Sequence, residues 1–393
     1  MKKALRKIHL WLSVPTGIII TLVCFSGAML VFEKEITEAI KPELYFVKEA
    51  KGDPIPMQEL MEKVEETLPD SVSISGVTVF ADSTRTYQVS LSKPRRASIY
   101  VNQYTGEVTG RSERLPFFNT MFHLHRWLLG SSSGVGKLLT GICTLVLVFI
   151  LITGILMWLT NRNKPLKASL AIHVTKGWGR FWHDLHVAGG IYTTIFLLAM
   201  ALTGLTWSFS WYRTGFYACF GVESSEKGGA HGEGGNSHGE GRSSRGEGRY
   251  SHGDGRNNHE GNHGEGRGFH RRSPYRHWED VLNEVALKNP GYQQITLKPG
   301  VAEVVPEGRL SMRAADKYSY DRRSGEIIDV QLYSAGKKDT KVRSGVYMVH
   351  TGSWGGIITR ILNFLAAFIG ATLPLTGYWL WFRRKRAAIA HHH

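Results

Sequence analysis

The sequence predicts an α-helical membrane protein with four transmembrane helices in two parallel pseudo-repeats, and two small α+β domains outside the bilayer. The main observation is that apolar residues gather in four blocks, Leu10–Phe32, Leu138–Thr160, Val187–Tyr212 and Ile361–Phe382, none of which contains a charged side chain. About 20 apolar residues, rising about 1.5 Å each, cross the hydrocarbon core of a bilayer. These blocks exclude a soluble enzyme, although only 42% of the 393 residues are hydrophobic.

The second observation is that the two halves of the chain repeat the same order of motifs. His9 precedes Gly27 by 18 residues, and His186 precedes Gly204 by the same interval. The second block ends with Thr153-Gly154 and then Trp158-Leu159, and the fourth ends with Thr376-Gly377 and then Trp379-Leu380. Both halves start on the same side of the membrane, so we expect parallel repeats related by an axis along the membrane normal.

The net charge of +15 is a topology signal. Three segments contain basic but no acidic residues: Met1–His9, Asn161–Arg180 and the tail after Phe382. The positive-inside rule places these segments, and both termini, in the cytoplasm of a bacterium, with the chain multi-pass in the inner membrane. The partner is therefore the lipid bilayer and no nucleic acid is expected. The final residues, 391–393, look like a remnant of a purification tag.

The long loops after the first and third spans each predict a small periplasmic domain. The first loop predicts an amphipathic helix at Met57–Leu68 and strands at Val77–Phe80, Tyr87–Leu91 and Ala97–Val101; the second predicts a helix at His277–Lys288 and strands near Gln294–Leu297 and Leu310–Ala314. The expected segments are 1–32 (span 1), 33–115 (domain 1), 116–160 (span 2), 161–182 (cytoplasmic basic loop), 183–212 (span 3), 223–272 (linker), 273–340 (domain 2), 350–382 (span 4) and 383–393 (cytoplasmic tail).

The segment Glu223–Arg272 has the composition of a flexible linker. It holds 15 Gly and 6 His, with 8 acidic and 8 basic residues, and almost nothing to bury. Its histidines invite a metal-binding hypothesis, but they show no fixed ligand spacing, and ordering a Gly-rich chain around a metal costs entropy. We therefore favour a hydrophilic tether, with weak metal capture as the alternative. These histidines are His231, His238, His252, His259, His263 and His270.

Four histidines occupy matching ends of the spans. His9 and His186 open the first and third spans on the cytoplasmic side, whereas His125 and His350 lie just before the second and fourth spans on the periplasmic side. The pseudo-symmetry turns each pair inward, and two facing imidazoles make an axial ligand pair for haem iron without any cysteine. One such pair at each face predicts an electron path through two haems.

Glycines on the spans support this hypothesis. Eighteen residues are about five helical turns, so Gly27 and Gly204 should lie near the periplasmic pair, where a missing side chain admits a flat macrocycle. Gly154 is about eight whole turns from His125 and shares its face if the helix is continuous. By the same reasoning Gly377 is roughly half a turn out of phase with His350.

Two further histidines are secondary candidates for ligands. His123 competes with His125, although residues two apart point to different faces of a helix. His183 lies one turn from His186 and either replaces it or binds a haem carboxylate. Arg126, and Arg180 beside the cytoplasmic pair, are placed to pair with those carboxylates, or else to anchor the interface.

The whole chain resembles the PepSY-associated transmembrane family. The resemblance is carried by Leu124-His125-Arg126, Asp184-Leu185-His186 and Val349-His350-Thr351-Gly352, and by the Gly-Glu turns within Tyr104–Val108 and Arg323–Ile327 of the PepSY-like loops. Within the family the chain is most similar to inner-membrane siderophore-iron reductases of the ferrioxamine type. That resemblance implies b-type haems, and the two histidine pairs would hold one each.

The expected function is that of an inner-membrane di-haem b oxidoreductase, a ferric-siderophore reductase that releases Fe(II) in the periplasm. The sequence has no Rossmann glycine fingerprint or P-loop, so no flavin or NAD site is recognised and electrons come from a cytoplasmic reductase or quinol. Two alternatives are a non-redox PepSY membrane protein that binds a periplasmic partner, and a metal-uptake accessory that uses the histidine-rich linker.

Overall fold

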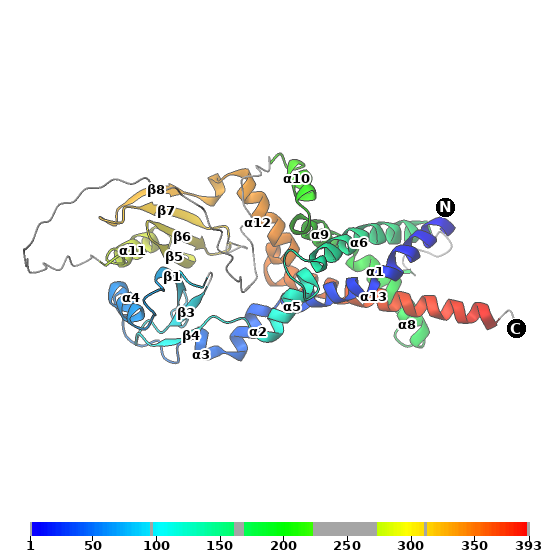
Figure 1. Ribbon diagram of the computed structural model, residues 1–393, viewed down its shortest axis with the longest axis horizontal. Helices are drawn as coiled ribbons and strands as arrows, with labels where there is room; N and C mark the ends of the chain where they lie inside the picture. Colours follow the sequence, from blue (N-terminus) through cyan, green and yellow to red (C-terminus); the bar gives the residue numbers. More distant parts are fainter. Residues whose placement is uncertain (1, 95–96, 161–168, 223–272, 310–312, 391–393) are drawn as a thin grey trace, which may run out of the picture.

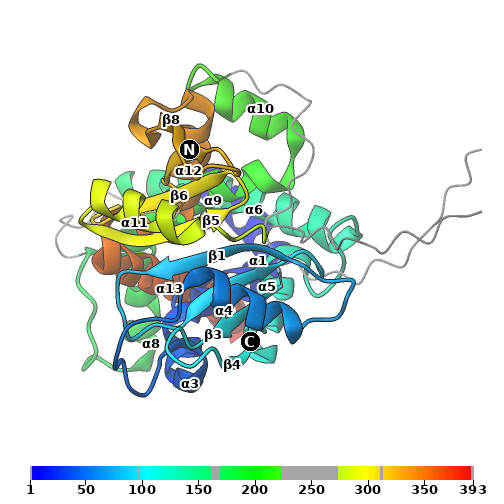
Figure 2. The ribbon, with the colours of Figure 1, turned by 90° about the vertical axis from the view of Figure 1, so that its left-hand side faces the viewer.

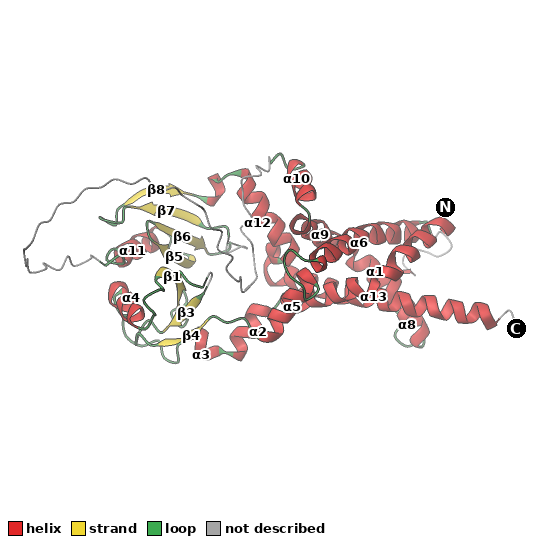
Figure 3. Ribbon diagram, in the orientation of Figure 1, coloured by secondary structure: helices red, strands yellow, loops and turns green. Residues whose placement is uncertain are grey.

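The computed structural model is elongated, with a helical bundle at one end and a β-sheet at the other (Figures 1 and 3). It describes residues 2–94, 97–160, 169–222, 273–309 and 313–390. Both termini lie at the end of the bundle far from the sheet (Figure 1). The predicted linker 223–272 and its histidines, and much of the basic loop, lie outside the described residues.

Four helices of the described chain are long and apolar enough to cross a membrane, as the four apolar blocks predict. They are α1 (Lys2–Leu30), α6 (Val135–Leu159), the run from α8 (Trp178–Asp184) through the π-helical turn Leu185–Gly189 into α9 (Gly190–Ser208), and α13 (Gly356–Ala390). Helices α1 and α9 each pack against both α6 and α13. The bundle is thus a closed ring in which α1 lies diagonally across from α9.

The histidines before the second and fourth spans lie on separate helices, which the sequence reading of continuous spans over 116–160 and 350–382 does not anticipate. Helix α5 (Pro116–Trp127) ends at Leu128 and Leu129, whose φ angles are 48° and 67°. Helix α12 (Lys338–Thr351) ends at Gly352, with φ +75°, before a 3₁₀ turn at Ser353–Gly355. A left-handed residue ends a helix by turning the chain so that its own N–H reaches the last carbonyls, as Leu128 N–H does at His123 and Leu124 and Gly352 N–H does at Met348 and Val349. Helix α5 packs on α1, and α12 packs on α9.

The sheet is one continuous eight-stranded antiparallel structure, where the sequence predicts two separate domains. Each half contributes four consecutive strands, and the halves join where β1 pairs with β5, from Val77 opposite Leu297 to Phe80 opposite Gln294. The pairing removes two exposed edges, which are liabilities in isolated sheets. The order is β4 (Val108–Arg111), β3 (Ser98–Val101), β2 (Tyr87–Leu91), β1 (Ile74–Phe80), β5 (Tyr292–Lys298), β6 (Val301–Pro306), β7 (Asp316–Tyr320) and β8 (Ile327–Gln331).

Helices α4 (Met57–Glu66) and α11 (Trp278–Lys288) cover the face of the sheet that points away from the bundle (Figures 1 and 2). They lie within two residues of the helices expected from the sequence. Their buried side chains recur at helical spacing, as Leu60 and Val64 do, and pack with those of both half-sheets in a single core. The strand expected at Leu310–Ala314 is absent from the described part of that range, since β7 begins only at Asp316.

Helix α2 (Glu33–Ile40) ties the bundle to the sheet. Three of its carboxylates form ion pairs with arginines from three other segments: Glu33 with Arg114 before α5, Glu35 with Arg360 of α13, and Glu38 with Arg85 between β1 and β2. Helix α3 (Pro42–Tyr45) then leads to the sheet, α10 (Ser210–Ala218) follows α9, and a 3₁₀ turn at Tyr333–Ala335 follows β8.

The Glu35–Arg360 pair predicts an acid-sensitive contribution to stability. The hydrogen bond from Arg360 lowers the pKa of Glu35, so the pair stabilises the folded protein above the unfolded pKa of a glutamate. This contribution is lost as pH falls through the lowered, folded pKa. We expect Glu35→Gln to lower stability by less than about 1 kcal/mol at pH 7, since the pair is partly exposed, and by less at pH 3. Thermal unfolding in detergent tests this, with Glu66→Gln on α4 as the control; a deficit that is equal at both pH values contradicts it.

Candidate functional site

The structure brings the four histidines together as two facing pairs. The ring centres of His9 and His186 lie 6.5 Å apart with planes nearly perpendicular at 88°, and those of His125 and His350 lie 6.1 Å apart at 55°. The first pair lies near the start of α1. The second lies near its other end, because His125 packs beside Gly27 of the same helix, about 27 Å further along.

Each imidazole is held through its Nδ1 atom by a different span. His125 Nδ1 lies 2.9 Å from the carbonyl oxygen of Val23. His350 Nδ1 lies 2.9 Å from that of Met200 and 3.2 Å from Thr203 Oγ1. At the other pair, His186 Nδ1 lies 3.1 Å from the carbonyl oxygen of Leu373 and 2.9 Å from Thr376 Oγ1, and His9 Nδ1 lies 3.0 Å from Thr153 Oγ1.

These contacts determine which ring nitrogen carries the proton. A carbonyl oxygen only accepts hydrogen bonds, so Nδ1–H donates at His125, His186 and His350. At His9, the Thr153 hydroxyl already donates to the carbonyls of Phe149 and Ile150, and its oxygen therefore accepts from His9 Nδ1–H. All four Nε2 atoms are left with a free lone pair, which is the state of a metal-binding imidazole whose orientation is fixed by an outer hydrogen bond.

A glycine lies against every one of these imidazoles. A Cβ atom on Gly27 would lie 2.8 Å from His125 Cε1, and one on Gly204 would lie 3.1 Å from His350 Cε1. At the other pair, a Cβ on Gly377 or Gly154 would lie 3.3 Å from His186 Cε1 or 3.6 Å from His9 Cε1. The glycines thus make room for the imidazole rings themselves, a more direct role than admitting a macrocycle.

The half-turn mismatch expected between Gly377 and His350 does not arise. Gly154 and His125 likewise do not share a helix face, because they lie on two different helices, α6 and α5. Both estimates assumed one continuous helix, whereas the chain turns at 128–134 and at 352–355. Gly377 and Gly154 instead face the pair at the other end of the bundle.

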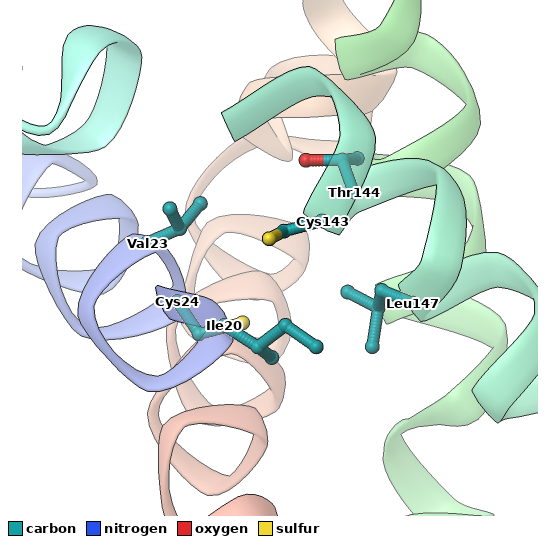
Figure 4. A pocket seen from close by; sticks show the side chains of 6 residues that line it. All are labelled: Ile20, Val23, Cys24, Cys143, Thr144 and Leu147. Carbon is teal, nitrogen blue, oxygen red and sulfur yellow. The ribbon is translucent and has the colours of Figure 1, made fainter. Parts of the chain in front are cut away.

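A cavity of about 1290 Å³ surrounds the His125–His350 pair. Its inner part lies between the spans and is mostly apolar, with Leu147, Leu197 and Ala367 among its lining residues. A narrow pocket between α1 and α6 continues from it into the bundle, and there the side chains of Cys24 and Cys143 point toward the gap (Figure 4). The outer part of the cavity opens beneath the sheet and is lined by charged side chains.

The remaining sequence candidates lie around the two pairs. Arg126 lines the cavity beside His125. His123 packs its ring 4.9 Å from that of Trp127 and is not among the described residues that line the cavity. His183 turns to Asp184, with its Nδ1 3.3 Å from a carboxylate oxygen. The structure therefore gives neither His123 nor His183 a place within a facing pair.

Two features of the site escaped the sequence reading. Asp184 is 4% exposed, and its carboxylate accepts hydrogen bonds from His173 Nδ1 and Arg180 Nε, both at 2.8 Å. His173 is thus anchored to Asp184, and Arg180 has a carboxylate partner within the chain. The other feature is the π-helical turn that carries His186, of a kind often found at functional sites.

A repeated pair of Ser or Thr followed by Gly marks the hydroxyl residues beside the histidines, and the sequence prediction used this pair only in the second and fourth spans. Ser26-Gly27, Thr153-Gly154, Thr203-Gly204 and Thr376-Gly377 place a Ser or Thr before a Gly in all four spans. Three of these hydroxyls contact the histidines, whereas Ser26 Oγ donates back to the carbonyls of Leu22 and Val23.

The donor set at each pair fits a b-type haem. Two imidazoles that bind one metal ion from opposite sides, with metal–nitrogen bonds of about 2 Å, have ring centres roughly 6 Å apart, as both pairs do here. Each pair supplies two nitrogen ligands, and a planar macrocycle supplies the other four. His9 and His186 would hold one such group, and His125 and His350 the other.

The fold and the paired histidines define a helical membrane protein with an antiparallel sheet outside its spans. Residues 6–384 match the family model described as the PepSY-associated TM region. The chain belongs to this family, as its motifs predict. No curated protein matches the sequence.

Proposed function

We propose that the protein carries electrons across a bacterial inner membrane through two bis-histidine haems and reduces a ferric siderophore on the side of the sheet. The observation that carries this proposal is that all four histidines donate Nδ1–H to a neighbouring span and face one another as pairs. A buried pair of imidazoles that served only packing would not need every Nε2 lone pair kept free. The resemblance to siderophore-iron reductases supports the same function.

A bis-histidine haem takes up and returns one electron at its iron. The chain's part is to hold the two imidazoles of each pair at a fixed distance, because rigid ligands limit the rearrangement that accompanies a change in charge. Apolar side chains of the spans, such as Leu197 and Ala367, also line the inner part of the site. In this proposal no residue acts as an acid, a base or a nucleophile.

The basic residues support a direction for the transfer. The basic residues of 2–9 and 383–390 lie at the end of the bundle away from the sheet (Figure 1), which supports a cytoplasmic location for that end and a periplasmic location for the sheet. The haem that His9 and His186 would hold would then be the one reduced by a cytoplasmic reductase or a membrane quinol. A quinol gives up two electrons and two protons, so one quinol serves two ferric ions. Each Fe(III) gains one electron, and the resulting Fe(II) is bound less tightly by hard oxygen ligands.

The first test is a reduced-minus-oxidised absorption spectrum of detergent-purified protein, with haem quantified per chain. We expect about two b-type haems per chain, and reoxidation of the reduced protein when a ferric siderophore is added, with Fe(II) trapped by a colorimetric chelator. Protein made with ample haem that shows no Soret band would reject electron transfer and favour a non-redox role in binding a periplasmic partner.

Thr376→Val is expected to change the potential of one haem without releasing it. The substitution removes one of the two acceptors of His186 Nδ1–H and keeps the Leu373 carbonyl. A weaker outer hydrogen bond makes the imidazole a poorer electron donor, so the potential should rise, by an amount equivalent to no more than about 1 kcal/mol. Redox titration followed at the Soret band measures this. Thr372→Val on the same helix serves as the control, because the Thr372 hydroxyl donates to the carbonyl of Ile369, which holds no histidine; equal shifts in both variants would contradict the role of Thr376.

A further inference from the structure

We propose that Lys137 binds a carboxylate of the haem held by His125 and His350, so that the charged edge of this haem faces the sheet and its apolar edge faces the interior of the bundle. This inference rests on the proposed function, because it takes the group between these two histidines to be a b-type haem. It deepens that function by naming the residue that would set the orientation of the haem. No motif of the sequence marks Lys137.

Lys137 differs from the other basic side chains in the described lining of the cavity around this pair. That lining includes eight Lys or Arg residues. Seven of them have a partner in the structure: an acidic side chain for Lys34, Arg85, Arg114, Arg309 and Arg360, and an aromatic ring for Arg126 and Arg313. For the side chain of Lys137, the structure gives neither an ion pair nor a ring contact among the described residues. Its ammonium group is therefore available to an anion that enters the cavity.

The position of Lys137 on α6 favours a bound anion over contact with lipid. Lys137 lies in the first turn of the helix, where a cation is unfavourable because the helix macrodipole places partial positive charge at this end. A carboxylate bound to the ammonium group would offset that cost. The next two residues, Leu138 and Leu139, are 52% and 39% exposed, as expected of side chains that face lipid, whereas Lys137 lines the cavity.

The lining of the cavity changes from polar to apolar in the direction away from the sheet. Helix α6 presents Lys137, then Thr140 and Thr144, then Leu147, and these positions share one face of the helix over about 15 Å. A b-type haem is an amphipathic plate of comparable length, with two carboxylates on one edge and apolar substituents on the opposite edge. The order of side chains on α6 fits a haem whose carboxylates point toward the sheet.

The packing of α6 on α9 places Lys137 within reach of such a carboxylate. Gly141, one turn after Lys137, packs against Ser208 of α9, and Gly204, which packs against His350, lies one turn before Ser208. Because α6 and α9 run in opposite directions, Lys137 lies about two turns, roughly 11 Å, nearer to the sheet than Gly204. A four-carbon lysine side chain and the flexible arm of a haem carboxylate together bridge such a distance.

The rate of haem release tests the proposal. Oxidised full-length protein in detergent is mixed with an excess of apomyoglobin, which takes up released haem, and the transfer is followed at the Soret band. We expect Lys137→Met to release one of the two haems roughly fivefold faster than the native protein, because it loses a charge-assisted hydrogen bond. Lys137→Arg keeps the charge and should release both haems at close to the native rates. Lys34→Met is the matched control, since Lys34 also lines the cavity but lies 4.0 Å from the carboxylate of Glu38.

Resonance Raman spectroscopy separates this role from a merely structural one. The bending mode of a haem propionate falls in frequency when the propionate loses a hydrogen bond. The spectrum is recorded in the His9→Ala background, which is expected to hold only the haem at the cavity. We expect this band to shift to lower frequency when Lys137→Met is added and to keep its position when Lys137→Arg is added. A lysine that only stabilised the start of α6 would change the release rate without moving the band.

Three results overturn the proposal: release from Lys137→Met at the native rate, equally fast release from Lys137→Arg, or a propionate band that Lys137→Met leaves in place. Lys137 would then serve only to anchor α6 at the membrane surface. A native protein that holds no haem would overturn the proposed function together with this inference. A protein that holds its haem through Lys137 but reduces no ferric chelate would contradict the proposed function alone and leave the assignment of Lys137 standing.

Discussion

His350→Ala is expected to remove one of the two haems and to abolish reduction of a ferric chelate. Among the described residues that line the cavity, the substitution leaves His125 as the only imidazole, and the Nδ1–H bonds to Met200 and Thr203 disappear with the ring. The His9–His186 pair shares no residue with this site, so its haem should stay. We therefore expect the haem content to fall by about half and ferric reduction to fall at least a hundredfold.

His9→Ala is the reciprocal experiment. It should remove the haem at the other end of the bundle and keep the one in the cavity, which then accepts electrons only from an artificial donor on the sheet side. His123→Ala is the matched control, because His123 lies two residues from His125 and packs against Trp127. Retention of both haems in His350→Ala, or loss of one in His123→Ala, would show that the ligand assignment is wrong.

Gly27→Ala is expected to disrupt the cavity site with the addition of a single methyl group. The new Cβ would lie 2.8 Å from His125 Cε1 and 3.0 Å from its Nδ1, distances that real Cβ atoms avoid or rarely reach. The imidazole cannot simply step aside, because its Nδ1–H bond to Val23 comes from the same helix one turn earlier. We expect a large loss of haem from this site, visible in the Soret absorbance per chain.

Gly154→Ala is the matched control for this prediction. It adds the same methyl group to another span, also next to a histidine, but at 3.6 Å from His9 Cε1, an ordinary contact distance. Ala also favours helix over Gly by up to about 1 kcal/mol, so this variant should bind both haems and be no less stable. Equal haem loss in the two variants would mean that small residues serve helix packing in general rather than the fit of His125.

Much of the helical architecture follows from the sequence alone, because a membrane imposes a strong and local constraint. A block of about 20 uncharged apolar residues has few structures open to it other than a spanning helix. The two soluble helices were also predicted to within two residues, since residues such as Leu60 and Val64 recur at helical spacing. Strand β6 was missed because Val304 and Val305 are both buried, which breaks the alternation that identifies strands.

The joining of the two half-sheets was not predictable from local pattern. Nothing within Val77–Phe80 or Gln294–Leu297 indicates that these strands pair with each other, because alternation reveals a strand but not its partner. The result matters for the site: with both halves in one sheet, the sheet covers the cavity as one body rather than as two domains that move separately.

The histidines themselves could be identified from the sequence, because an ionisable group at membrane depth is rare and these four occur at matching positions. Their orientation was not. It depends on the breaks after Trp127 and Thr351, where Leu128 and Gly352 adopt left-handed conformations. The break at Leu128 has no sequence signal, since leucine seldom adopts a positive φ. Whether the pairs bind haem stays a prediction.

The way the pairs are assembled from the two halves of the chain has a consequence for how such a protein arises. Each pair takes one histidine from the first half and one from the second: His9 with His186, and His125 with His350. A chain of half this length, with the same plan, would own a single ligand for each site and could complete either one only by associating with a second copy about a two-fold axis. Fusion of two such copies into one polypeptide would make the assembly independent of protein concentration. It would also let the residues that support each histidine differ between the halves, as Ser26 and Thr203 differ beside their glycines.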